Sequence, residues 1–117
     1  MSVCDAEGRL IALQRMDGAY AEACRESIGK AIASVSSGRP SGDDPIERPE
    51  HSRPLTVVGE GAPLIRRRGG LPIILAGQVE GAIGVGGTYN NVSDPDCEKC
   101  ALAGIGALEA SAKANKV

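Results

Sequence analysis

The chain has 117 residues and a formal net charge of −2, with no Phe, no Trp and only two Tyr. Its length predicts one domain, and its charge gives no electrostatic reason to expect nucleic acid or an anionic membrane as a partner. The scarcity of aromatic side chains also removes the stacking platforms used to bind single-stranded nucleic acid.

The core must therefore be built from Ile, Leu, Val and Ala, which makes association between subunits an attractive way to bury more surface. No apolar run approaches the roughly 20 residues of a membrane span, and no signal peptide precedes the first predicted strand. We therefore expect a cytoplasmic protein whose cysteines are free thiols.

The first predicted element is a β-hairpin over residues 2–17. Asp5 and Gly8 hold the first and fourth places of a four-residue turn, as a type I turn prefers. The strand before the turn ends at Cys4, and the strand after it covers residues 9–16.

A helix of about four turns is predicted from Tyr20 to Gly38, because apolar residues recur there at helical spacing and glycine is the usual stop. Asp17 is expected to cap its start. Lys30 has two interpretations: it pairs with Asp17 or Glu26 on the surface, or it approaches a ligand as an acid or base. The structural interpretation is favoured.

Residues 36–68 form an irregular loop, since their prolines exclude a long helix. A short edge strand is expected over residues 55–58. His51, the only histidine of the chain, is either solvated or the best available general base and haem ligand. Arg68, the last of three consecutive arginines, is a candidate to hold a carboxylate.

A second hairpin is predicted over residues 71–85, with a turn at Gly77-Gln78. Glycines are costly in a strand, so the glycines in and after the second strand of this hairpin predict the close approach of another backbone. Either they floor a small ligand pocket, with Thr88, Tyr89 and Asn90 at its rim, or they allow tight packing of a helix or subunit. These glycines are Gly81, Gly84, Gly86 and Gly87.

A helix is predicted over residues 94–113, capped by Ser93 or by the aspartate after it. Cys97 and Cys100 form a CxxC motif in its first turns. Three interpretations stay open: thiols made reactive by the helix dipole, a metal site joined by Cys4 or Cys24, or small apolar helix positions.

Six segments, in order along nearly the whole chain, carry a resemblance to a known family. They are VCDAEGRL at residues 3–10, RMDGA at 15–19, KA at 30–31, GGLPI at 69–73, GAIGVGG at 81–87, and CA at 100–101 with Gly104. With these segments the chain resembles the GlcG/HbpS-like family, which also supplies the C-terminal domain of PduO.

The resemblance implies a profilin-like α/β domain, an antiparallel sheet of about five strands with helices on both faces, assembled into homo-oligomers. Some members of this family bind haem, and others are linked to glycolate or diol metabolism. Members usually carry a helix of about 20 residues before the first strand. Its absence leads us to expect that a neighbouring copy, or a second chain, covers the exposed sheet and the flank of the last helix.

Two functional hypotheses from different classes follow. The first is an oligomeric protein that binds a small organic acid or a haem-like cofactor at a subunit interface. The second is a lyase, isomerase or hydrolase acting on a carboxylated substrate, with Arg68 on the carboxylate and Lys30, His51 or Tyr89 moving protons. The sequence shows no recognisable pair of nucleophile and general base and no cluster of metal ligands, which favours the binding hypothesis. The candidate ligand-binding residues are Arg68, Gly84, Gly86, Gly87, Thr88 and Asn90.

Overall fold

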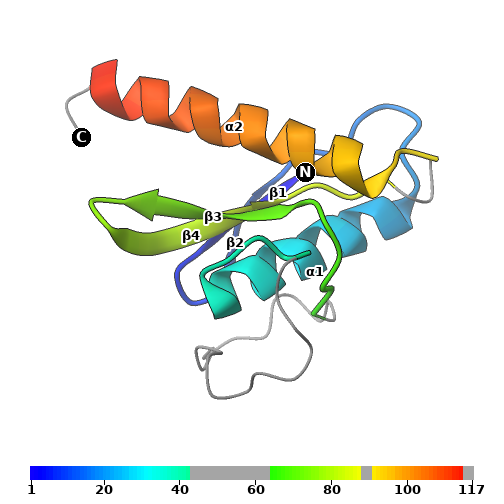
Figure 1. The fold of residues 1–117 in the computed structure, drawn as a ribbon. Helices are drawn as coiled ribbons and strands as arrows, with labels where there is room; N and C mark the ends of the chain where they lie inside the picture. The colour runs from blue at the N-terminus through cyan, green and yellow to red at the C-terminus, as the bar shows by residue number, and fades with distance from the viewer. Residues whose placement is uncertain (43–63, 88–90, 115–117) are drawn as a thin grey trace.

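The structure, a computed structural model, describes residues 1–42, 64–87 and 91–114. Within these ranges a four-stranded antiparallel sheet, in the order β2-β1-β4-β3, lies between two helices (Figure 1). The elements are β1 (Ser2–Asp5), β2 (Leu10–Leu13), α1 (Ala21–Ser37), β3 (Gly70–Leu75), β4 (Gln78–Gly84) and α2 (Asp94–Ala114).

The predicted class, an antiparallel α/β domain, is confirmed, but the described residues contain four strands where about five were expected. The edge strand expected over residues 55–58 lies outside the described residues. The predicted loop also began too early, because residues 36–37 still belong to α1.

The first hairpin forms where the turn chemistry predicted it. The backbone N–H of Gly8, whose φ is +83°, donates to the carbonyl oxygen of Asp5 at 3.1 Å. The Asp5 carboxylate accepts the backbone N–H groups of Glu7 and Arg9, as aspartate does at the start of a turn. The second strand is shorter than predicted and ends at Leu13.

The second hairpin turns at Ala76-Gly77, one residue earlier than predicted. Both residues have positive φ, +51° and +77°, as the two central residues of a type I′ turn require. The strand register shifts between Ile73 and Ile74.

Helix α1 ends as predicted but begins differently. Gly38 terminates it in the left-handed conformation with φ of +72°. Tyr20 occupies the N-cap position without a side-chain capping bond, so the prediction that Asp17 caps this helix is wrong. Asp17 lies three residues too early, in an exposed loop that is closed instead by two hydrogen bonds from the Arg15 guanidinium to the Ala19 carbonyl oxygen.

The two helices cover opposite faces of the sheet (Figure 1). On one face Cys4 and Ala82 pack with Ala31 and Val35 of α1 to form the core cluster. On the other face α2 lies over β3 and β4. Small side chains let the elements approach closely, as expected for a chain without Phe or Trp.

Helix α2 is capped by Ser93, whose hydroxyl accepts the backbone N–H of Asp96 at 3.3 Å, as one of the two predicted caps. Leu102 and Leu108 on this helix are 62% and 38% exposed. Among the described residues, no helix combines the length and apolar character needed to cross a membrane. The cytoplasmic location stays a prediction.

Candidate functional site

The glycines of the second hairpin allow α1 to lie directly on the sheet. Gly70 and Gly84 are paired across β3 and β4, and a Cβ on either would overlap a backbone carbonyl oxygen of α1, that of Lys30 or of Ser27. A Cβ on Gly86 would overlap the carbonyl oxygen of Ala23. The packing interpretation therefore accounts for these glycines, because any side chain would push the helix away.

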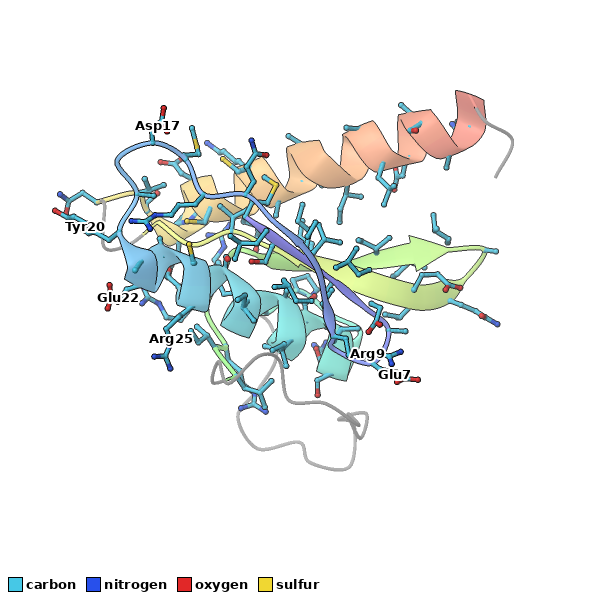
Figure 2. The ribbon with its side chains drawn as sticks, turned by 180° about the vertical axis from the view of Figure 1, so that it is seen from behind. Glu7, Arg9, Asp17, Tyr20, Glu22 and Arg25 are labelled. Carbon is cyan, nitrogen blue, oxygen red and sulfur yellow. The ribbon has the colours of Figure 1, made fainter. Side chains whose placement is uncertain are left out.

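Beyond the end of β4 the closely packed layers open into a pocket of about 410 Å³. Gly86 and Gly87, two of the predicted ligand-binding residues, line it, whereas Gly84 does not. The wall opposite comes from the loop before α1, whose outer edge is marked by Asp17 in Figure 2. The lining residues are Met1, Gln14 to Ala19, Ala23, Cys24, Val85 to Gly87, Val92 and Cys100.

The pocket is largely apolar, with its charged side chains on the loop. The Arg15 guanidinium is oriented by its Nε and Nη2 groups, which donate to the Ala19 carbonyl oxygen at 2.9 and 2.6 Å. A guanidinium has five N–H donors, so others are left to meet a ligand. The Asp17 carboxylate points away from the ribbon (Figure 2), so Arg15 gives the pocket its side-chain positive charge.

Lys30, a predicted proton carrier, is in the interior. Its side chain is 0% exposed, and Nζ lies 2.8 Å from Oε1 of Glu26 and 3.6 Å from Oδ1 of Asp94. It also donates to the Val85 carbonyl oxygen at 3.1 Å. Arg67 adds two bonds of 3.1 Å to the same aspartate.

These four ionic side chains, which we call the Lys30 cluster, connect α1 with the segment before β3 and with the first residue of α2. They are Glu26, Lys30, Arg67 and Asp94. The ion pair between Lys30 and Glu26 was one of the predicted alternatives, but it is buried and not on the surface. Lys30 does not line the pocket, so the cluster supports the pocket wall without reaching a ligand.

Arg68, the predicted carboxylate holder, also turns to α2. Its Nη2 donates to Glu98 at 3.0 Å with the side chain about half exposed, and it is absent from the pocket lining. His51, Thr88, Tyr89 and Asn90 lie outside the described residues.

The two cysteines of the CxxC motif lie in different environments. Cys97 is fully buried, and burial raises the pKa of its thiol although the nearby Lys30 ammonium opposes the shift. A helix-activated thiolate is therefore the wrong interpretation for Cys97, which is a small core residue. Cys100 is exposed and lines the pocket. Among the residues that the structure describes, no three His, Cys, Asp or Glu side chains come together as a metal site.

Several lining residues were not predicted from the sequence as site residues, above all Arg15, Met16 and Cys24. Arg15 and Met16 belong to the RMDGA segment that supports the family resemblance, and this was the only signal for them. Cys24 was considered as a ligand only in company with the CxxC motif. The fold alone places it in the same pocket as Cys100.

Comparison with known proteins relates the chain to one family. A family model described as "Haem degrading protein HbpS-like" matches residues 1–105. An uncharacterized 15.0 kDa protein in the dhaT-dhaS intergenic region of Citrobacter freundii is 34% identical over 88 residues, which are 74% of this chain and 61% of that protein. The match thus spans less than two thirds of the relative's length.

The crystal structure of the Klebsiella pneumoniae protein ORFY, which carries the family designation DUF336, is similar with a TM-score of 0.62. It is 31% identical, and the alignment covers 91% of this chain and 73% of that one.

Proposed function

The chain belongs to the HbpS-like family, and we propose that it is a binding protein whose ligand, a small organic acid or a haem-like cofactor, occupies the pocket beside Gly86 and Gly87. The observation that carries this proposal is the pocket itself. Its volume of about 410 Å³ lies at the lower end of the roughly 300–1,000 Å³ that small-molecule sites occupy. A small acid fits inside, and a larger cofactor extends from the open mouth.

The charge distribution of the pocket supports a ligand with an apolar body and an acidic end. Met16, Val85 and Val92 offer apolar contact, and the oriented Arg15 guanidinium offers paired N–H donors, which suit a carboxylate. We therefore assign the carboxylate to Arg15 in place of Arg68, whose guanidinium is engaged by Glu98.

The enzyme hypothesis is favoured by no observation on the described residues. Of its three proton carriers only Lys30 is described, and its Nζ is enclosed by Glu26, Asp94 and the Val85 carbonyl oxygen.

Filling the pocket tests the proposal. Ala19→Trp places an indole in the lining, and Ala110→Trp, on the exposed side of α2, is the matched control. Purified wild type is titrated with haemin while the Soret band is followed, and a panel of short carboxylic acids is examined by thermal shift. We expect saturable binding of one class, at least tenfold weaker in Ala19→Trp and unchanged in Ala110→Trp. Absence of binding in both assays, or equal binding by Ala19→Trp, refutes the proposal.

We further propose that the protein works as a homo-oligomer. Leu102 on α2 and Ile74 on β3 are 62% and 50% exposed, and Met16 at the pocket is 77% exposed. A second copy that covers such side chains would gain about 25 cal/mol for each Å² of apolar area removed from water, and it could close the pocket mouth. Light scattering after size exclusion tests this: a folded monomer at tens of micromolar contradicts it, and Leu102→Glu should shift an oligomer towards smaller species.

A further inference from the structure

The pocket gathers most of the sulfur in the protein. The chain has four cysteines and two methionines, and four of these six residues line this one pocket: Met1, Met16, Cys24 and Cys100. Figure 2 shows sulfur atoms, in yellow, grouped between the loop that carries Asp17 and the start of α2. Apolar lining alone does not explain this, because Leu and Ile provide apolar surface without sulfur.

The fold separates the cysteines into two classes. Cys4 and Cys97 are core residues, 3% and 0% exposed, and burial raises the pKa of both thiols, that of Cys4 to about 11. Cys24 and Cys100 instead face the pocket, from α1 and from α2. The thiols that can reach a ligand are thus the two that share one cavity.

The two thiols that line the pocket also influence one neighbouring group, the amino group of Met1. Burial lowers the pKa of the Met1 amino group, and Cys24 and Cys100, together with Cys97, oppose that shift. All therefore lie within electrostatic range of the same nitrogen. The Met16 side chain is 77% exposed, and its three torsions let its sulfur turn into the pocket.

The donor set determines which metal the pocket suits. Thiolate and thioether ligands select soft ions, and monovalent copper accepts both. Hard cations need oxygen ligands, but the only carboxylate in the lining, Asp17, points away from the ribbon. Zinc sites are built from Cys, His and carboxylates, usually four of them, and thioethers are not among its ligands.

We propose that Cys24 and Cys100 bind a monovalent copper ion as thiolates, with Met16 as a third, thioether ligand. Each thiol transfers its proton to solvent when the metal binds, so that affinity increases with pH. The inference goes beyond the proposed organic ligand, because it needs the two thiols and not the Arg15 guanidinium.

The test is an anaerobic titration of the full chain with Cu(I) against a chromophoric Cu(I) chelator, followed by X-ray absorption of the loaded protein. We expect one equivalent of copper in a first shell of sulfur. Cys24→Ser and Cys100→Ser should each weaken binding at least tenfold, Met16→Leu severalfold, and the core control Cys97→Ala less than twofold.

Three results would overturn the site. The first is a copper stoichiometry that falls equally whichever cysteine is replaced. The others are equal Cu(I) affinity in Cys24→Ser and wild type, and tighter binding of Zn²⁺ than of Cu(I). Haemin and carboxylic acid binding is measured on Cys24→Ser in parallel, which separates the two proposals. Loss of copper with unchanged binding of the organic ligand supports the copper site, whereas failure of the organic ligand alone leaves the copper result standing.

Discussion

Replacing Lys30 by methionine tests whether the Lys30 cluster holds the two helices to the sheet. Methionine keeps most of the length and the apolar stem but removes the ammonium group. The Glu26 carboxylate, which is 4% exposed and 2.8 Å from Nζ, then loses the ammonium group that faces it in the interior. Asp94 loses a partner as well, but it keeps two bonds to Arg67 and is 23% exposed.

The expected magnitude follows from burial. Removing one member of a buried ion pair costs about 3–5 kcal/mol, chiefly because the remaining charge is left uncompensated. An exposed pair contributes about 0–1 kcal/mol. Lys99→Met is the matched control, since its ammonium lies 3.8 Å from Asp96 with the side chain 80% exposed. We therefore expect Lys30→Met to lower the free energy of unfolding by about 3–5 kcal/mol and Lys99→Met to change it by at most about 1 kcal/mol.

The assay is urea unfolding at pH 7, followed by circular dichroism, for the wild type, both single variants and the double variant Lys30→Met with Glu26→Leu. The double variant removes both buried charges and should be more stable than Lys30→Met alone. If Lys30→Met proves too unstable to purify, Glu26→Gln provides the milder perturbation. Equal midpoints for Lys30→Met and Lys99→Met would refute the argument that the buried pair is energetically important.

Three further predictions follow from local geometry. Gly84→Ala should destabilise the fold by about 1–3 kcal/mol or more, because the added Cβ overlaps a carbonyl oxygen of α1. Gly106→Ala in α2, where the added Cβ meets open space, should stabilise the fold by up to about 1 kcal/mol. Urea unfolding midpoints of the two variants and the wild type test both predictions. Burial raises the pKa of Asp5, but hydrogen bonds from the backbone and Arg9 outweigh it and hold that pKa below its ordinary value. The stability lost in Asp5→Asn at pH 7 should therefore begin to diminish below about pH 4 and vanish as the pH falls through the lowered pKa. Cys100 should react with a thiol reagent in the folded protein, and Cys4 only after unfolding, as mass spectrometry of the labelled peptides would show.

Each of these has a clear contrary result. Equal effects of the two glycine substitutions would mean that α1 does not rest on β4 as closely as described. A stability difference between wild type and Asp5→Asn that persists at pH 2 would show that the carboxylate charge is not its source. Rapid labelling of Cys4 in the native state would contradict its 3% exposure.

Local sequence signals predicted the elements well, because turns and helix ends depend on residues that are neighbours in the chain. Gly8 and Gly38 adopt the positive φ that their turn and helix stop require. Two local predictions were wrong by one to three residues. The turn of the second hairpin is formed by Ala76 and Gly77, and the N-cap position of α1 is occupied by Tyr20 and not by Asp17. The family resemblance, carried by segments over nearly the whole chain, is confirmed.

The candidate site was less predictable, since its members come from parts of the chain that meet only on folding. The sequence indicated that the glycine-rich strand must be closely approached, but packing and ligand binding place the same demand on a glycine. Only the folded chain shows that Gly84 packs against helix α1, while Gly87 lines a cavity.

The sequence by itself determined an α/β domain with two hairpins, two helices and membership of its family, because periodicity, turn residues and motifs are written along the chain. The tertiary structure decided which charges and thiols are buried. Lys30 meets the Val85 carbonyl oxygen 55 residues away, and Cys24 shares a pocket with Cys100. Burial depends on such distant contacts, and burial determines whether a lysine or a cysteine supports the fold or meets a ligand.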